Sequence, residues 1–113
     1  MKRKDELPEC PVATAVNLIG GKWKLLILRN LKFRPWRFNE LQNDLDGVSH
    51  KVLTDSLRQM MNDGLVDRRD FHENPPHVEY ALSELGNSML PIIDALAAFG
   101  THYKQVVESM ECK

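Results

Sequence analysis

The chain has 113 residues, of which 42% are hydrophobic and 27% charged, with a formal net charge of −1 at pH 7. This length predicts one domain over 1–113, the near-zero charge excludes a general polycation, and two cysteines, Cys10 and Cys112, exclude a small disulfide scaffold. Because the chain shows no leader-type apolar run and no apolar stretch near the roughly 20 residues that cross a bilayer, we expect a cytoplasmic protein without a membrane partner.

Charge is distributed unevenly along the chain, despite the near-zero total. Positions 10–39 contain basic residues and no acidic one, whereas positions 70–80 contain acids and neither Lys nor Arg. The basic residues are Lys22, Lys24, Arg29, Lys32, Arg34 and Arg37. A protein with one side facing a polyanion needs such asymmetry, although a basic face that is merely solvated gives the same pattern.

A first helix is predicted at about 10–19, after a charged opening at 1–9 that we expect to be frayed. Pro11 suits the first turn of this helix, because the N–H that proline lacks would have no partner there. Gly20-Gly21 is a stop signal that ends the helix.

A second helix is predicted at about 22–31. Pro35 then interrupts the chain, which makes 33–36 a link with room for a short strand. At the 3.6-residue period, the inward face of the helix consists of Trp23, Leu26, Ile27 and Leu31.

A helix-turn-helix unit is predicted over about 38–62. Its first helix covers about 38–45, and an Asp46-Gly47 turn leads into a second helix of about 49–62 with Ser49 as its N-cap. The inward positions are Phe38, Leu41 and Leu45 in the first helix and Leu53, Leu57, Met60 and Met61 in the second. Two helices joined by a short glycine-containing turn are typical of DNA-binding units that place the second helix in the major groove.

Two β-type runs follow at about 65–71 and 77–82, joined by the short proline-rich connection 72–76. We predict that they form a hairpin, the wing of a winged helix, over about 65–82. The expected fold class is therefore mainly α with a small β-hairpin (α+β). After the hairpin, Ser83 caps a helical region of about 84–110, in which Pro91 either kinks the helix or starts a new one.

The apolar stripe of this C-terminal region is broader than one side of so small a domain would cover. It consists of Leu90, Ile92, Ile93, Leu96, Ala97, Phe99, Tyr103, Val106, Val107 and Met110. The breadth favours a partner helix from a second copy, because DNA readers with two half-sites are usually symmetric dimers. Packing across the helical core of the same chain is the alternative.

Several spaced motifs occur in one order over about 10–100. They are Cys10-Pro11-Val12, Ile19-Gly20-Gly21-Lys22-Trp23-Lys24, Arg37-Phe38-Asn39-Glu40-Leu41, Ser49-His50-Lys51-Val52-Leu53-Thr54, Leu57-Arg58, Asp63-Gly64-Leu65-Val66, Pro75-Pro76-His77-Val78-Glu79-Tyr80, Leu82-Ser83-Glu84-Leu85-Gly86 and Leu90-Pro91-Ile92. Together they resemble the HxlR-type regulators, winged-helix bacterial transcription factors related to the MarR group. Phe99 stands where Trp is common in that family, which is a conservative change.

This resemblance implies a homodimeric, sequence-specific DNA-binding repressor or activator. The terminal helices, about 10–19 and 84–110, would form its dimer interface. We expect a repressor that reads an inverted-repeat operator, with helix 49–62 in the major groove and the hairpin as wing. The expected partners are double-stranded DNA and a second copy of the chain; no small-molecule effector can be read from the sequence.

Candidate DNA contacts come from the second helix of the unit, the wing and the basic segment. Lys51 or Arg58 would contact guanine, and Thr54 a thymine methyl or a phosphate. Asp55 would accept from a cytosine amine or face solvent. The full set is Ser49, His50, Lys51, Thr54, Arg58, Arg68, Arg69, Arg37 and Lys24, with Lys22 and Arg34 as further phosphate candidates. Alternation along a strand puts Arg68 and Arg69 on opposite faces, so only one of them is expected to reach DNA.

Cys10 stands at the N-cap position before Pro11, where a helix N-terminus stabilises a thiolate. Members of the resembled family with a cysteine here include thiol-based sensors of oxidants and electrophiles. Cys10 and Cys112 are therefore candidate redox-sensing residues, which a bridge between subunits could join. The alternative is that Cys10 is a structural residue at the interface and Cys112 an unpaired tail thiol.

An enzyme is not expected. The segment Gly20-Gly21-Lys22-Trp23 lacks the spacing of a phosphate loop, no G-x-S-x-G or H-E-x-x-H occurs, and the four histidines show no paired metal-ligand spacing. We therefore expect no cofactor and no metal. The remaining alternatives are a winged-helix protein–protein interaction module without specific DNA binding, and an RNA binder, which would need exposed aromatic residues for stacking.

Overall fold

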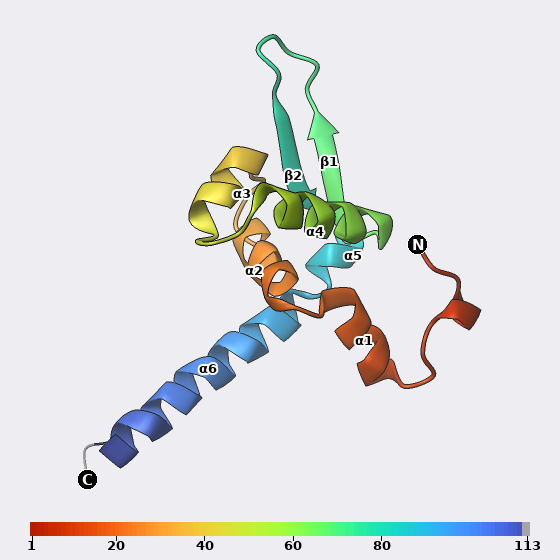
Figure 1. Cartoon of the computed structure of the whole chain (residues 1–113). Helices are drawn as coiled ribbons and strands as arrows, with labels where there is room; N and C mark the ends of the chain where they lie inside the picture. Colours follow the sequence, from red (N-terminus) through yellow and green to blue (C-terminus); the bar gives the residue numbers. More distant parts are fainter. Residues whose placement is uncertain (112–113) are drawn as a thin grey trace.

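Helices and one antiparallel hairpin make up the fold of this chain in the computed structural model, which describes residues 1–111 (Figure 1). After a 3₁₀ turn, η1 (Lys4–Glu6), the elements in chain order are α1 (Pro11–Ile19), α2 (Lys22–Leu31), α3 (Phe38–Asp44), α4 (His50–Asn62), β1 (Val66–Asp70), β2 (Val78–Leu82), α5 (Glu84–Asn87) and α6 (Leu90–Glu111). Each predicted helix of the first two thirds is present, with bounds within about one residue of those expected.

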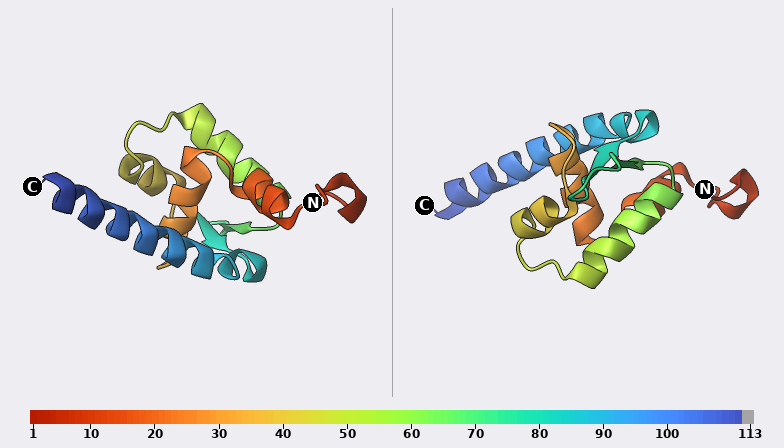
Figure 2. Two further views of the ribbon diagram at one scale, coloured as in Figure 1. Left: turned by 90° about the horizontal axis from the view of Figure 1, so that it is seen from below. Right: turned by 90° about the horizontal axis from the view of Figure 1, so that it is seen from above.

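The central element is α2, which lies between α4 on one side and α6 on the other (Figure 2). The hairpin stands on the body formed by α2, α3 and α4, and α6 leads away from it in the opposite direction (Figure 1). Among residues 1–111, no helix has both the length and the apolar character that crossing a membrane would require.

The hydrophobic core lies where α2, α3, α4 and the base of the hairpin meet. Its most deeply buried side chains are Ile27, Leu28, Leu41, Leu45, Leu53, Leu57, Met60 and Leu65. The predicted inward positions Leu41, Leu45, Leu53, Leu57 and Met60 are therefore confirmed. Burying such side chains is the main stabilising contribution to a fold of this size.

Two predicted core faces are only partly as expected. Met61 is half-buried against the core, and Ser56, on another side of α4, is buried. In α2, Trp23 and Leu26 are half-buried and pack against the core, and Leu28 and Asn30 are buried in addition to Ile27 and Leu31. The reason is that α2 has neighbours on more than one side, so its burial does not follow a single stripe.

The hairpin pairs Val66 with Leu82 and Asp70 with Val78 at its two ends. Its strands are slightly shorter than predicted. The link before α3 joins it as a third, one-residue strand: the Trp36 N–H donates to the Tyr80 carbonyl at 2.9 Å, and the Tyr80 N–H donates back at 2.7 Å. The short strand that the sequence allowed in this link is therefore present.

The region after the hairpin is two helices rather than one. Ser83 caps the short α5 by accepting a hydrogen bond from the Gly86 N–H at 2.9 Å. Gly86 is required there, because a Cβ at this position would lie 2.1 Å from the Leu65 carbonyl oxygen. Pro91 occupies the first turn of α6, where the N–H that proline lacks would have no partner within the helix. Of the two possibilities for Pro91, the start of a new helix is correct.

The opening segment 1–9 follows a defined path instead of being frayed. Leu7 and Pro8 are half-buried, and the Thr14 hydroxyl donates to the Pro8 carbonyl at 3.2 Å. Met1 lies against Gly64, at the end of α4. The segment therefore folds back across the body.

Candidate nucleic-acid interface

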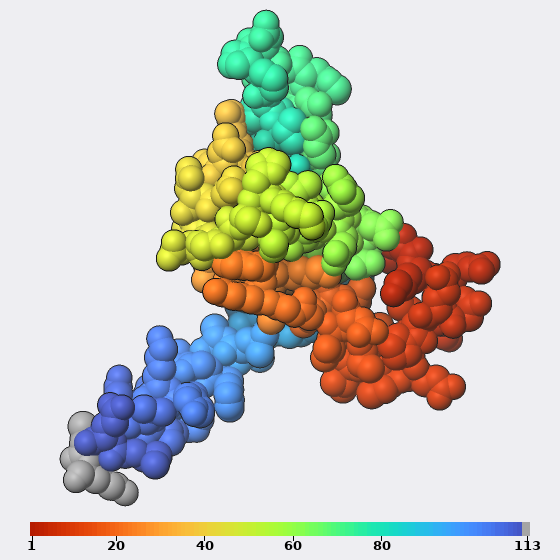
Figure 3. All heavy atoms as spheres, viewed as in Figure 1, coloured from red at the N-terminus to blue at the C-terminus, as the bar shows by residue number. Residues whose placement is uncertain are grey.

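One side of α4 faces solvent while the other side anchors it in the core. Lys51, Thr54, Asp55 and Arg58 are spaced at i, i+3, i+4 and i+7, which places them on one face of the helix. Lys51 and Arg58 are exposed, and Thr54 and Asp55 are half-buried. In the space-filling view, α4 forms the front of the body below the hairpin (Figure 3). A long polar face of this kind, half of it exposed, is open to a large ligand.

The first turn of α4 is held by its cap. The Ser49 hydroxyl oxygen accepts a hydrogen bond from the Val52 N–H at 3.1 Å, as predicted for an N-cap. The His50 ring packs against the Phe38 ring of α3, with 4.8 Å between the ring centroids. Lys51 and Asp55 form an exposed ion pair of 3.3 Å, which water weakens and a stronger anion can replace.

The link into α3 carries two basic side chains with defined surroundings. The Arg34 guanidinium lies 4.0 Å from the Trp36 ring centroid and 3.3 Å from a Glu40 carboxylate oxygen. The Arg37 N–H donates to the same Glu40 carboxylate at 2.9 Å. This backbone hydrogen bond, together with the Arg34 charge, holds the pKa of Glu40 below its usual range. The Arg37 side chain is exposed at the start of α3.

The two wing arginines lie on opposite faces of the hairpin, as alternation predicts. Arg68 is paired with Tyr80 and shares the face that continues into the buried Val66. Arg69 lies on the other face and lines a shallow hollow with Lys32 and Arg34. The Arg68 guanidinium lies 3.9 Å from the Asp70 carboxylate.

The wing tip is acidic. His77 lies between two carboxylates, with Nδ1 at 3.4 Å from Glu73 and Nε2 at 2.8 Å from Glu79. The Asp70 carboxylate accepts the His72 N–H at 2.8 Å, and this hydrogen bond lowers the pKa of Asp70. A polyanion would therefore meet the arginines along the strand rather than the tip.

Comparison with known proteins identifies the family. Residues 18–108 match the model of the HxlR-like helix-turn-helix family. The chain belongs to this family. It is 45% identical over 94 residues to an HTH-type transcriptional regulator of Methanothermobacter thermautotrophicus, a match that covers 83% of this chain and 72% of the relative.

Solved structures agree with this assignment. The HxlR-like chain is similar to a MarR-family transcriptional regulator from Porphyromonas gingivalis W83, with 42% identity and a TM-score of 0.79 over 89% of this chain and 97% of that one. It is also similar to the redox regulator HypR in its reduced form, with 35% identity and a TM-score of 0.83 over 88% and 99% of the two chains. The predicted family and the winged-helix fold are confirmed, and the relatives are transcriptional regulators.

The predicted residues of this HxlR-like protein do not all come together. Ser49, His50, Lys51, Thr54 and Arg58 lie along α4. Arg37 is on α3, and the wing pair is on β1. Lys24 lies apart from these residues, half-buried in a cavity near the opposite end of α4, and its phosphate contact stays a prediction. The Lys22 amino group lies 4.5 Å from the Trp23 ring centroid.

The structure adds a residue that sequence reasoning missed. Val52, in the first turn of α4, is 38% exposed beside Lys51. A branched apolar side chain in this turn can contact a thymine methyl group. The sequence signal for its exposure was its position outside the buried stripe that contains Leu53 and Leu57.

The predicted redox residues are only partly described. Cys10 is exposed and forms the N-cap of α1 without a side-chain cap hydrogen bond. Cys112 lies outside the described residues. Within residues 1–111, no three His, Cys, Asp or Glu side chains are grouped to share a metal ion.

Most of the apolar stripe of α6 is exposed in the single chain, although Ile93 is buried and Leu90 packs against the core. Its exposed members alternate at spacings of four and three residues, the heptad pattern of helices that pair with another helix. They are Ile92, Leu96, Phe99, Tyr103, Val106 and Met110. Val12 and Val16 of α1 are also exposed, by 70% and 55%.

Proposed function

We propose that this HxlR-like protein is a homodimeric, sequence-specific DNA-binding repressor that reads an inverted-repeat operator. The observation that carries the proposal is the exposed polar face of α4, whose opposite face is fixed in the core by Leu53, Leu57 and Met60. A helix presented in this way fits the major groove, and its first turns reach base edges. The family of transcriptional regulators supports this use of the surface.

Each residue of the surface has a proposed role. Lys51 or Arg58 contacts guanine, and Thr54 or Val52 contacts a thymine methyl group. Ser49 and Arg37 contact phosphates, because a helix N-terminus and an exposed guanidinium both favour anions.

The wing supplies one arginine to the backbone or the minor groove, where the negative potential attracts it. Arg68 lies on the hairpin face that continues into the core, and Arg69 lies on the face with Lys32 and Arg34. Separate Arg68→Ala and Arg69→Ala variants identify which of the two contributes to DNA affinity.

The dimer that we propose forms through α6 and α1. Large apolar side chains such as Phe99, Tyr103 and Met110, each more than 60% exposed, are unfavourable in water and are covered when two copies of α6 pack along their heptad stripe. A two-fold dimer presents two copies of α4 to two half-sites of opposite direction.

In vitro selection of bound DNA tests the proposal. We expect an inverted repeat, bound with an affinity that falls steeply as the salt concentration rises. A promoter carrying the selected repeat should then be transcribed less in the presence of the protein; increased transcription would contradict the repressor role. Failure to enrich any sequence, with no salt-dependent DNA binding, would favour the protein–protein interaction module instead.

A second function, redox or electrophile sensing through Cys10, is favoured by the exposure of this thiol beside α1. The similarity to the redox regulator HypR supports it. In the proposed reaction, Cys10 of one subunit and Cys112 of the other lose two protons and two electrons to an oxidant such as diamide and form a disulfide. We expect diamide to produce a dimer on a non-reducing gel and to change operator affinity, and Cys10→Ser to abolish both effects. An unchanged gel and unchanged affinity would contradict sensing.

A further inference from the structure

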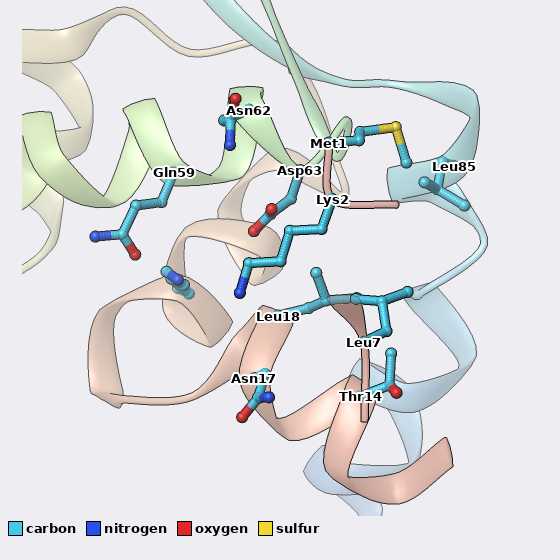
Figure 4. Close-up of a pocket in the computed structure, with 11 residues that line it drawn as sticks. Met1, Lys2, Leu7, Thr14, Asn17, Leu18, Gln59, Asn62, Asp63 and Leu85 are labelled. Carbon is cyan, nitrogen blue, oxygen red and sulfur yellow. The ribbon is translucent and has the colours of Figure 1, made fainter. Parts of the chain in front are cut away.

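A cavity of about 320 Å³ lies where the opening segment, α1, α2 and the end of α4 meet (Figure 4). Small-molecule sites in proteins usually measure about 300–1,000 Å³, so this one suits a small ligand. Met1 and Leu7 form the wall contributed by the opening segment, which the Thr14 hydroxyl holds in place through its bond to Pro8. Of the candidate DNA contacts, Lys24 alone lines this cavity, and it lies apart from the others.

The lining combines an apolar side with polar groups. Leu7, Leu18 and Leu85 supply apolar surface from three separate parts of the chain. Asn17 and Gln59 supply side-chain amides, which donate and accept hydrogen bonds. A ligand that fits this lining has an apolar body and one polar end.

The charges of the lining favour an anion at that polar end. Two ammonium groups, those of Lys2 and Lys24, line the cavity with one carboxylate, that of Asp63. Figure 4 labels Lys2 and Asp63. The negative end of the α4 dipole also lies near Asp63, so an anion is less favourable at this end of the cavity. Among residues 1–111 neither lysine forms an ion pair, but Lys24 is half-buried whereas Lys2 is exposed, so Lys24 is the better partner for an anion. A partly desolvated ammonium gains from a bound anion.

We propose that this cavity binds a small organic carboxylate. The carboxylate pairs with Lys24, and the apolar body packs against Leu7, Leu18 and Leu85. The site draws on the opening segment, on α1 and on the last turn of α4, so a bound ligand ties α4 to the helix that carries the exposed Val16. Any effect of the ligand on operator affinity rests on the proposed DNA-binding function; the binding itself does not.

The test uses the full-length protein without DNA, and octanoate as the probe, below its micelle concentration. Octan-1-ol and octylamine provide a neutral and a cationic ligand of the same chain length. We expect octanoate to bind at least about tenfold more tightly than either, as measured by isothermal titration calorimetry, because only the carboxylate can accept a charge-assisted hydrogen bond from Lys24. NMR shift changes should centre on Thr14, Asn17 and Asn62.

Two variants probe the role of charge. Lys24→Met keeps the apolar stem of the side chain and removes the ammonium, so octanoate affinity should fall about tenfold to the level of octanol, while octanol affinity stays unchanged. Asp63→Asn removes the competing carboxylate and should tighten octanoate binding. Lys22→Met is the matched control, because Lys22 lies on the same helix but does not line the cavity.

Three outcomes would overturn the proposal. They are octanoate affinity unchanged by Lys24→Met, tighter binding of octylamine than of octanoate, and shift changes located along α6 instead of the cavity. Thermal unfolding of each variant without ligand shows whether the variant folds. If Lys24→Met does not fold, the octanoate affinity of Asp63→Asn decides. Unchanged or weaker octanoate binding by Asp63→Asn also contradicts the proposed site. Loss of operator binding with intact octanoate binding would count against the DNA function alone.

Discussion

The side-chain amide of Asn30 donates a 2.8 Å hydrogen bond to the Asp44 carboxylate, across the space between α2 and the end of α3. Arg29 supports this contact: its Nε donates to the Asn30 side-chain oxygen at 3.1 Å, and it lies 3.6 Å from Asp44. The Trp36 indole N–H donates to the Asn30 carbonyl at 3.0 Å. Asn30 thus positions α3 through its side-chain amide and the link through its backbone carbonyl, and with them the body against which α4 packs.

Replacing this amide should destabilise the fold. Asn30→Ala removes a buried hydrogen bond to a charged group, and we expect the free energy of unfolding to fall by roughly 1–3 kcal/mol. Urea unfolding followed by circular dichroism measures the change. Asn39→Ala, at an exposed position of α3, is the matched control and should change stability little. Equal stability of the two variants would show that the Asn30 network contributes nothing net.

Arg58→Ala should weaken binding to the selected operator by about 1–3 kcal/mol and relax base preference at one position, if the guanidinium forms a bidentate contact with guanine. Fluorescence anisotropy on the operator and on single-base variants measures both effects. Lys104→Ala removes the same charge from α6 and should leave affinity and preference unchanged. A parallel loss in both variants would mean that only net charge matters.

Ser49 allows capping to be separated from DNA contact. Ser49→Ala removes the bond to the Val52 N–H and should cost about 1 kcal/mol of stability. Ser49→Asp keeps an N-cap acceptor and should preserve stability, but it places a negative charge where a phosphate would bind, so operator affinity should fall. If Ser49→Asp binds the operator normally, no phosphate lies at this end of α4.

The α6 stripe should control the oligomeric state. Phe99→Glu places a charge within the proposed apolar interface and should convert the dimer to a monomer, with loss of binding to the inverted repeat. Thr101→Glu adds the same charge on the opposite side of α6 and should leave the dimer intact. Sedimentation velocity over a range of protein concentrations distinguishes the two. A dimer that survives Phe99→Glu would place the interface elsewhere.

Glu40 should make stability depend on pH in one direction. Its folded-state pKa lies below the usual 4.5, so its contribution is fully present above pH 4.5 and is lost as the pH falls through the folded-state pKa. Glu40→Gln should therefore be less stable than the wild-type protein at pH 7, and the difference should shrink in more acidic buffer. Urea midpoints at a series of pH values measure it; a difference that does not vary with pH would assign the effect to packing.

Periodicity and stop signals were sufficient to predict the helix-turn-helix unit. Leu41, Leu45, Leu53 and Leu57 recur at helical spacing, and Ser49 precedes the second helix as a cap, so the sequence already contains the buried face and its start. Exposure of Lys51 and Arg58 follows from the same periodicity, because residues on the face opposite a buried stripe face solvent.

Features that depend on contacts between distant segments were not predictable. Asn30 reads as a surface residue of a helix, and only Asp44 on another helix makes its burial favourable. Pro91 is compatible with a kink and with a new start, and the close approach of Gly86 to Leu65 accompanies the new start. The cavity around Lys24 exists because the opening segment folds back on the body, which no local pattern in 1–9 indicates.

The reciprocal backbone bonds between Trp36 and Tyr80 couple the entry to α3 directly to the second strand of the hairpin. The helix-turn-helix unit and the wing therefore resist tilting relative to each other. In an operator complex, the distance between the major-groove and minor-groove contacts of one half-site would be set by the protein, and the duplex would have to bend to match it. This fixed spacing favours operators whose flanking base-pair steps deform easily. Base pairs that no side chain touches would therefore still influence affinity.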